Sequence, residues 1–392
     1  MRPLQGITVV TLEHAIAAPL CTRHLADLGA RVIKVERPGS GDFARAYDHR
    51  VDGLSSHFVW TNRGKESLTL DIKHPDGAAV LKRLLARCDV LVQNLAPGAT
   101  ARLGLSHAAL QPDHPELIVC DISGYGDSGP YRDRKAYDLL IQGESGFLSV
   151  TGTPETPSKA GCSIVDIAAG MYAYSNILAA LLARQAGAGG RRIDISMLEA
   201  MVEWMGFPLY YTYQNAPPPP RSGAAHAAIY PYGPFTTGDG RKVLLAIQNE
   251  REWQRFCSEV LRQPALTEDA RFSSNAQRVA NRDVLDTILL DSFSTLDAVG
   301  LRARLDAAAI ANADVNAVDD LWQHPQLQAR QRWSTMGSPV GPLPTLLPPG
   351  VDQSPPGGAG DVPDLGQHTD RILAELGLSD GDTAALRSAG VV

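Results

Sequence analysis

The chain has 392 residues, of which 44% are hydrophobic and 20% are charged, a composition typical of globular proteins with a substantial core. This length exceeds one ordinary domain and fits two. The net charge is −7 and no basic run occurs, so we expect neither nucleic acid nor a membrane as a partner. Residues 1–20 lack the pattern of a secretory leader, and we find no stretch long and apolar enough to cross a bilayer, which together predict a cytoplasmic protein.

Five cysteines stand at wide and irregular spacings, and their number is odd. This pattern predicts reduced thiols rather than a disulfide framework. No C-x-x-C pair occurs, and none of the ten scattered histidines stands at metal-ligand spacing from a second ligand. We therefore predict no metal site.

The first half of the chain alternates between β-rich and helical patterns. Residues 7–12 predict a strand, the apolar spacing over 19–29 predicts a helix, and 31–36 predict a second strand. Further predicted elements of this half are strands at 67–72, 89–95 and 117–123 and a helix at 74–88. Such alternation is typical of a parallel sheet with helical crossovers. The sequence therefore predicts an α/β fold with a large Rossmann-like doubly wound domain.

The turn after the first predicted strand, TLEHAIAAPL, contains no glycine. A dinucleotide pyrophosphate needs the close backbone approach that the glycines of a G-x-G-x-x-G turn allow. We therefore exclude a nicotinamide- or flavin-dependent enzyme.

Asp166 is the most informative residue of the sequence. It stands in GCSIVDIAAGMY, residues 161–172, where apolar residues recur at helical spacing as far as about residue 183. The segment is apolar nearly all round, which predicts a buried helix with Asp166 in its first turn, where the helix field favours an ionised carboxylate. Asp166 is then either a helix-start charge or a reactive group. Cys162 is an alternative nucleophile, although a buried, inert thiol is the commoner case.

The second half begins with a change of composition. Residues 206–225, which include a proline run at 217–220, predict an extended linker. A hairpin is expected at 238–240, with helices at 250–261, 282–293, 299–309 and 318–330. These elements predict a smaller α+β domain over 226–330. A second linker is expected at 343–360, after which two short helices return to the large domain, formed by 1–205 and 331–392.

The order of several strings resembles one family. They are LQGITVVTLEHAIAAPLCTRHLADLGARVIKVERPGSGD, TNRGKESLTLDIKHPDG, DVLVQNLAPGATARLG, KAYDLLIQGESGF, IVDIAAGMYA and LGQHTDRILAELG. The chain resembles family III CoA-transferases, which include formyl-CoA and carnitine CoA-transferases and the related α-methylacyl-CoA racemases. The resemblance covers nearly the whole length. It implies an interlocked homodimer of ring-like chains, an aspartate nucleophile at Asp166, and no cofactor beyond coenzyme A, which is itself a substrate together with a free carboxylic acid.

The chemistry of such a transfer fits a side-chain carboxylate. Asp166 would attack the donor thioester to give a mixed anhydride, and the released thiolate would convert the anhydride to an aspartyl thioester. The acceptor acid would then repeat these steps in reverse. Covalent catalysis of this kind splits one difficult step into easier ones. Water must be excluded because both intermediates hydrolyse.

The same resemblance assigns contacts with coenzyme A. Those near its phosphates and adenine are Arg37, Lys73, Arg102 and Lys135, those along its groove are Ile72, Asn94 and Leu95, and Tyr137 and Asp138 lie close by. Dispersed cations suit a ligand with several phosphate charges. The alternative is that these are solvated surface charges, as most Lys and Arg are.

Two departures from the formyl-CoA enzymes bear on the substrate. Ile16 stands where those enzymes carry glutamine, and residues 230–235 replace their glycine-rich loop. The strings GDFARAYD, IYPYGPF and QNEREW resemble the dicarboxylate-handling branch, so we expect a C4 or C5 dicarboxylate. A second carboxylate in an apolar site needs a cationic partner. Candidates are Arg45, our first choice because a guanidinium grips a carboxylate with two hydrogen bonds, and His49, Arg50 and His57.

Two other functions stay open. A racemase of this superfamily would need a histidine where this chain has Tyr137, and a tyrosine is a poor base at neutral pH. A catalytically silent acyl-CoA-binding protein is the alternative from another class, and the presence of Asp166 weighs against it.

Overall fold

The computed structural model describes residues 2–351 and 359–392, whose contacts divide them into two units. The first unit contains the segments up to Ser145, Ala160–Met205 and Gln326–Val392, and the second contains Gly146–Lys159 and Gly206–Pro325. The sequence analysis assigned residues 146–159 to the large domain and 206–225 to a linker. In the structure both segments group with the second unit.

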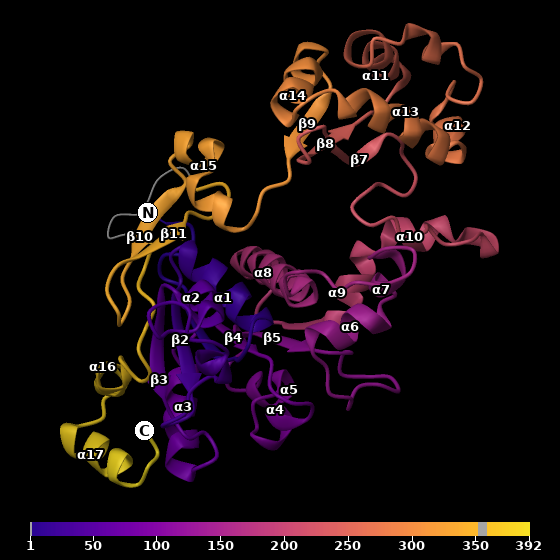
Figure 1. Ribbon diagram of the computed structural model, residues 1–392. Helices are drawn as coiled ribbons and strands as arrows, with labels where there is room; N and C mark the ends of the chain where they lie inside the picture. Colours follow the sequence, from indigo (N-terminus) through magenta and orange to yellow (C-terminus); the bar gives the residue numbers. More distant parts are fainter. Residues whose placement is uncertain (1, 352–358) are drawn as a thin grey trace. The chain divides into compact units, whose positions relative to one another are not determined.

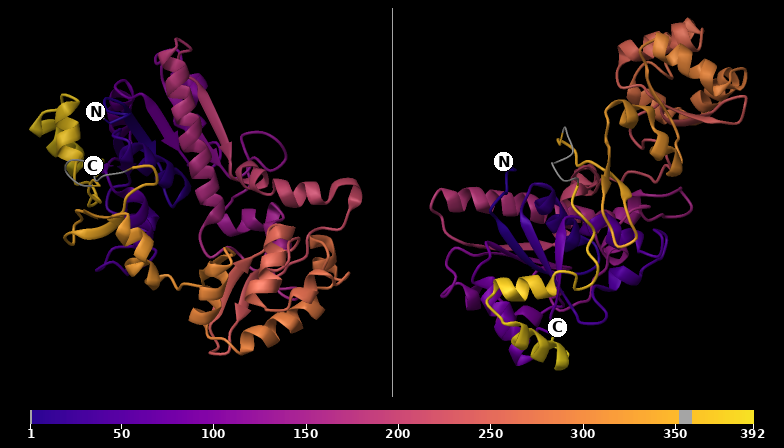
Figure 2. Two further views of the ribbon diagram at one scale, coloured as in Figure 1. Left: turned by 90° about the horizontal axis from the view of Figure 1, so that it is seen from above. Right: turned by 90° about the vertical axis from the view of Figure 1, so that its left-hand side faces the viewer.

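A six-stranded parallel sheet forms the centre of the first unit (Figures 1 and 2). In spatial order its strands are β3 (Lys65–Thr69), β2 (Arg31–Glu36), β1 (Thr8–Leu12), β4 (Val90–Gln93), β5 (Ile118–Ser123) and β6 (Arg192–Ser196). Val9 of β1 pairs with Val32 on one side and Val90 on the other. The predicted parallel α/β sheet is confirmed. The sequence did not predict β6, because only two of its five residues, Ile193 and Ile195, are apolar.

Helices cover both faces of this sheet. The helices of the first unit are α1 (Ala17–Asp27), α2 (Ser56–Asn62), α3 (Pro75–Leu85), α4 (Ala99–Arg102), α5 (His107–Leu110), α6 (Asp138–Glu144), α8 (Ile164–Gln185), α9 (Met197–Trp204), α16 (Thr369–Glu375), α17 (Asp380–Ser388) and the 3-10 helix η1 (Phe43–Ala46). On one face Val10, Ile33 and Leu91 pack in one core with side chains of α3 and α16. On the other, α1 contacts β2 and β4, and α8 contacts β5 and β6. Strand residues on both faces are therefore buried.

The helix α8 is half buried, although its sequence predicted a helix buried all round. Val165, Ala169 and Ile177 are fully buried, whereas Leu182 is 68% exposed. By length and composition this 22-residue helix could cross a membrane, so the expectation that no stretch is long and apolar enough was wrong on that measure. The finding is weak evidence for a membrane, because core helices of soluble proteins meet the same criterion.

A glycine sets the distance between α8 and α1. A Cβ atom at Gly170 would lie 2.6 Å from the carbonyl oxygen of Ala17 and 3.4 Å from Cβ of Leu20. The first of these distances is too short for any real side-chain carbon. Gly170 stands about one turn after Asp166, so this contact determines how closely the start of α8 approaches the start of α1.

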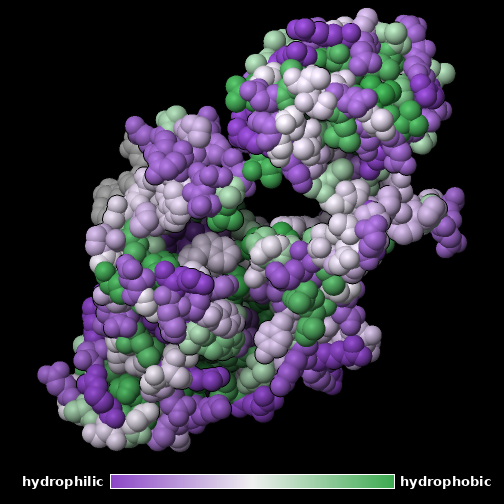
Figure 3. All heavy atoms as spheres, in the orientation of Figure 1, coloured by the Kyte–Doolittle hydropathy of each residue, from purple (hydrophilic) through white to green (hydrophobic). Residues whose placement is uncertain are grey.

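The second unit holds an antiparallel sheet in the order β7-β8-β9. On the face of this unit drawn in Figure 3, hydrophobic residues are interspersed among hydrophilic ones. Its elements are α7 (Phe147–Val150), α10 (Gly206–Tyr211), η2 (Tyr213–Asn215), β7 (Tyr232–Thr236), β8 (Lys242–Ala246), α11 (Glu250–Arg255), the π-helix η3 (Phe256–Val260), η4 (Pro264–Thr267), α12 (Asn275–Ala280), α13 (Arg282–Ser294), α14 (Ala298–Ala307), β9 (Ala311–Asp314) and η5 (Asp319–Gln323). Trp253, Phe256 and Phe293 are buried in its core. The hairpin predicted at 238–240 is confirmed by the β7–β8 pairing.

Three predicted segments differ from the structure. The helix expected over 318–330 is divided into η5 and α15 (Pro325–Ala329). The linker expected at 343–360 begins as strand β11 (Leu343–Leu346), which pairs with β10 (Trp333–Met336), and its residues 352–358 lie outside the described part of the chain. The linker expected at 206–225 begins as α10. In the first two segments the prolines obscured the short helices and strands that the structure contains. Such elements tolerate proline in a first helical turn or on an edge strand.

The contact at Gly170 predicts a stability effect. Gly170→Ala should lower the free energy of unfolding by about 1–3 kcal/mol, because the new methyl group must push α1 and α8 apart. Gly161→Ala is the matched control, since a Cβ there meets nothing within 4 Å. Chemical denaturation of both variants measures the difference. Equal stabilities of the two variants would contradict the packing argument.

Candidate active site

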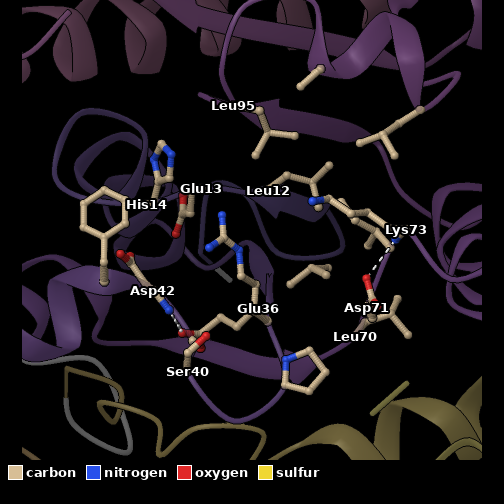
Figure 4. A pocket seen from close by; sticks show the side chains of 18 of the residues that line it. Leu12, Glu13, His14, Glu36, Ser40, Asp42, Leu70, Asp71, Lys73 and Leu95 are labelled. Carbon is tan, nitrogen blue, oxygen red and sulfur yellow. Dashed lines mark hydrogen bonds between the residues drawn. The ribbon is translucent and has the colours of Figure 1, made fainter. Parts of the chain in front are cut away.

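A cavity of about 630 Å³ opens at the carboxyl ends of the first four strands (Figure 4). Leu12 ends β1, Glu36 ends β2, Leu70 follows β3 and Leu95 follows β4, and all four line it. The strand order reverses between β1 and β4, and doubly wound sheets bind their ligands at such a point. The volume is also that of a small-molecule site.

Five residues predicted to contact coenzyme A line this cavity: Arg37, Ile72, Lys73, Leu95 and Arg102. They follow three different strands, so the fold gathers residues that are far apart in the sequence. Arg37, Lys73 and Arg102 form no ion pair within residues 2–351 and 359–392, which leaves three cations for an anionic ligand. These three cations suit the phosphates of coenzyme A.

The other predicted contacts lie elsewhere. Lys135 and Tyr137 do not line the cavity, and both are exposed, Tyr137 by 65%. Asn94 supports the turn after β1, where it donates to the carbonyl of His14 and accepts from its amide. Ile16 is buried at the N-cap of α1.

A buried ion cluster lies behind the cavity. Nζ of Lys34 is 2.7 Å from Oδ2 of Asp42 and 3.5 Å from Oε1 of Glu13. Nζ of Lys65 is 2.6 Å from the same Glu13 oxygen, and all four side chains are fully buried. Burial alone would raise the pKa of Glu13, but the charges of Lys65 and Lys34 hold it below its usual value. The cluster fixes Asp42 and Glu13, which both line the cavity.

Glu36 extends this cluster to Arg45. The guanidinium of Arg45 donates to both carboxylate oxygens of Glu36, at 2.9 and 2.8 Å, and stacks 3.8 Å from the ring of Phe58. Burial alone would raise the pKa of Glu36, but this hydrogen bond and the charge of Lys34 hold it at about 2. Arg45 is therefore committed to a structural ion pair, which argues against its choice as the partner of a substrate carboxylate.

The sequence analysis missed the buried charges for a physical reason. Residues 31–36 show an alternation that predicts a half-exposed strand, which would place Lys34 in solvent. In a parallel sheet covered on both faces this position is buried. A lysine inside a predicted parallel strand is therefore itself a signal that a buried carboxylate partner exists, here Asp42 and Glu13.

Asp166 lies in the first turn of α8. Burial, and then the charge of Asp138, raise the pKa of Asp166 to about 7. It forms no ion pair within the described residues. Asp166 is half-buried, and among those residues it lacks the cationic partner that Glu36 has. A carboxylate whose pKa is raised in this way is a common feature of functional sites.

Asp138 caps the start of α8 from another helix. Its Oδ1 accepts from the amides of Val165 (2.8 Å) and Asp166 (3.4 Å). Its Oδ2 accepts from Gln142 at 2.6 Å, and Gln142 in turn accepts from the amide of Ala160. Asp138, predicted as a contact of coenzyme A, thus positions the start of α8 in this structure.

An aromatic row leads from the cavity wall to His57. The ring of Phe43 lies 5.7 Å from that of Tyr47, which contacts His57 edge-on at 5.3 Å. Burial, and then the charges of Asp42 and Asp166, raise the pKa of Tyr47 to about 12, so its phenol stays protonated. His57, a predicted substrate contact, places Nδ1 3.2 Å from a carboxylate oxygen of Asp48. His49 and Arg50 lie on the surface.

The five cysteines are free thiols, as the sequence predicted. Cys162 is exposed, however, so the interpretation of it as a buried thiol was wrong. It stands on the segment before α8, where the chain turns at the surface. Among the described residues no group of three His, Cys, Asp or Glu could hold a metal ion.

The cation-lined cavity of the doubly wound sheet and the half-buried Asp166 of the same unit fit an enzyme that handles a phosphate-bearing ligand. The sequence profile described as CoA-transferase family III matches residues 4–369, and the chain belongs to this family of CoA-transferases.

Relatives and solved structures agree with this assignment. The succinate–glutarate CoA-transferase of Agrobacterium fabrum is 34% identical over 384 residues, covering 95% of this chain and 96% of that protein. The succinyl-CoA:glutarate CoA-transferase of Homo sapiens is 33% identical, covering 100% and 90%. The crystal structure of a CAIB/BAIF family protein from Brucella suis is similar with a TM-score of 0.82 at 32% identity, covering 96% and 99%.

The Asp138 contact predicts a pH effect. If Asp166 is the nucleophile, kcat/KM should rise with pH through about 7, as its carboxylate ionises. Asp138→Asn removes the like charge but keeps an oxygen that can accept from Val165, so the midpoint should move to lower pH by up to about 1 unit. Asp138→Ala, which also removes the cap, should in addition cost about 0.5–2 kcal/mol of stability. An unchanged midpoint in Asp138→Asn would contradict this coupling.

Proposed function

We propose that this CoA-transferase moves coenzyme A between dicarboxylic acids and that Asp166 accepts it as an aspartyl thioester. The observation that carries the mechanism is the half-buried Asp166 carboxylate, which has a raised pKa and no ion pair among the described residues. Glu36, a structural carboxylate of this unit, is instead neutralised by Arg45. A carboxylate without a cationic partner destabilises the fold. A role as the nucleophile of the reaction would explain why such a carboxylate is present.

The proposed reaction proceeds through two covalent intermediates. An oxygen of ionised Asp166 attacks the thioester carbon, the carbon–sulfur bond breaks, and CoA leaves as its thiolate from a mixed anhydride. The thiolate then attacks the carbonyl carbon of Asp166, which releases the first acid as a carboxylate and leaves the aspartyl thioester. The second acid attacks this thioester, and the same two steps in reverse give the new acyl-CoA and free Asp166. Charge and atoms balance without a further cofactor.

The surroundings of Asp166 suit these steps. Burial lowers the solvation of its carboxylate, which makes an ionised oxygen more reactive, and limits water that would hydrolyse the intermediates. Asp138 ties the first turn of α8 by two backbone hydrogen bonds, so the nucleophile is held in one position.

The dicarboxylate preference is supported by the relatives that are named for succinate and glutarate. The second carboxylate of such an acid needs a positive or hydrogen-bonding partner. Arg45 is occupied by Glu36, so His57, in the first turn of α2, becomes the candidate. Asp48 holds Nδ1 of His57, and this leaves Nε2 for a substrate oxygen.

We also propose a homodimer. Apolar side chains are exposed along α10 of the second unit, with Phe207 at 56%, Leu209 at 60% and Tyr210 at 80%. On the first unit, Leu182 of α8 is exposed as well. Exposed apolar surface of this extent marks interaction sites, and symmetric self-association is the commonest way to cover it.

The homodimer has a direct test. Sedimentation velocity should give the mass of two chains down to nanomolar concentration, because an interlocked pair separates only when the chains unfold. Tyr210→Glu, which places a charge on the exposed helix, should reduce the yield of dimer, whereas Glu155→Gln, on an exposed loop, should not. A folded monomer at micromolar concentration would contradict the proposal.

Transfer to dicarboxylates can be measured with labelled acid. With succinyl-CoA and labelled glutarate, label should enter the CoA ester, and the unmodified enzyme should use succinyl-CoA better than propionyl-CoA. Turnover without label in the ester would identify transfer between the two carboxylates of one acid. Equal use of both esters would contradict the dicarboxylate preference.

Substitutions in the same assay test the nucleophile. Asp166→Asn should reduce transfer by at least about 10³-fold while free CoA still binds, because the cavity cations are untouched. Cys162→Ser should keep full activity and excludes the thiol as nucleophile. Full activity of Asp166→Asn would defeat the mechanism.

A further inference from the structure

His14 occupies a backbone position that is strongly fixed. It follows Glu13 in the turn between β1 and α1, and Asn94 binds both its amide and its carbonyl, at 3.0 and 2.9 Å. The next residue, Ala15, has a φ of 62°, in the left-handed region that disfavours a side chain. Asp42 accepts from the amide of Ala15 at 3.2 Å. A strained backbone conformation that several hydrogen bonds hold in place is frequent at functional sites.

The imidazole of His14 extends from this turn into the cavity. It lies 4.8 Å from the ring of Phe43 and lines the cavity wall (Figure 4). Its Nδ1 is buried without a hydrogen-bond partner among the described residues. The Nε2 atom of the same ring is not among the buried atoms, and it too has no hydrogen-bond partner among the described residues. The ring therefore offers Nε2 to the cavity.

The protonation of the ring follows from this burial. Burial is the largest effect on His14 and lowers its pKa, more than the charge of Asp42 raises it, so the ring is neutral at pH 7. A neutral imidazole carries one proton, on either nitrogen. Buried N–H groups without an acceptor are rarer than buried acceptors without a donor. The proton therefore belongs on Nε2, where it can be donated to a ligand.

The two ends of the cavity are lined by different residues. Lys73 and Asp71 lie on one side in Figure 4, and His14 lies on the other, with its ring 4.8 Å from that of Phe43. The His14 side leads through Phe43 to Tyr47, whose pKa responds to the charge of Asp166. If the phosphates bind at the Lys73 end, the thioester of the same ligand extends toward His14.

We propose that His14 donates a hydrogen bond from Nε2 to the carbonyl oxygen of the bound acyl thioester. This inference rests on the proposed function, because the oxygen becomes negatively charged only when a nucleophile such as Asp166 attacks the carbonyl carbon. A fixed, neutral donor stabilises that charge without reorganisation and without a proton transfer. His14 is then a catalytic residue that the sequence analysis passed over.

Two substitutions test the hydrogen bond. His14→Phe keeps an aromatic ring against Phe43 but removes the donor, and His14→Gln restores an N–H group of similar reach. The Phe variant should lose about 10²–10³-fold in kcat/KM for succinyl-CoA, with free CoA bound as tightly as before. The Gln variant should recover at least tenfold of this loss.

Three outcomes would overturn the proposal: full activity of His14→Phe, equal activities of the Phe and Gln variants, or a loss of CoA affinity in the Phe variant as large as its loss of kcat/KM. The last result would show that His14 serves folding or nucleotide binding. Failure of the proposed function is seen separately, because Asp166→Asn would then transfer CoA normally whatever the result at His14.

Discussion

The pair of Lys34 and Asp42 is the interaction on which the site depends. Its atoms lie 2.7 Å apart, with no exposure of either side chain. The other oxygen of Asp42 accepts from the amides of Ala15 and Ala44, so one buried ion joins the turn after β1 to the loop after β2. Breaking one partner of such a pair leaves an uncompensated buried charge, which costs about 3–5 kcal/mol. The walls of the cavity near His14 and Phe43 are thereby held to the sheet.

Two carboxylates of the first unit show how the environment decides their roles. Glu36 accepts hydrogen bonds from the guanidinium of Arg45 and from other groups, and its pKa falls to about 2. Its carboxylate therefore stabilises the fold at pH values above its ordinary pKa, and this stability is lost as the pH falls toward 2. Asp166 gains burial and a like charge, and its pKa rises to about 7. Between its ordinary pKa and 7 the folded chain binds the extra proton, so Asp166 reduces stability as the pH rises through this window.

The sequence predicted the sheet well because its signals are local. The pattern over 31–36 predicted β2 (Arg31–Glu36) with its exact bounds. Five of the nine residues assigned to coenzyme A, among them Arg37 and Lys73, meet in one cavity because all follow the carboxyl ends of strands. These assignments came from the family resemblance, and the parallel topology explains why they converge.

The sequence failed where the partner of a side chain lies on another element of the fold. Arg45 was an attractive ligand for a substrate, but it is bound by Glu36, and no local pattern shows that pairing. No local pattern shows either that Asp138 caps a helix that begins more than twenty residues later. The apolar run of α8 predicted complete burial, because periodicity cannot show which part of an apolar helix the rest of the unit leaves exposed.

The central claim is that coenzyme A becomes bound to the carboxylate of Asp166. Mass spectrometry of peptides after acid quenching of the enzyme with succinyl-CoA tests it most directly. The account predicts a peptide that contains Asp166 and carries the mass of CoA, released by hydroxylamine and absent when Asp166 is replaced by asparagine. Turnover with unmodified Asp166, or CoA attached to another residue such as Cys162, would contradict the account.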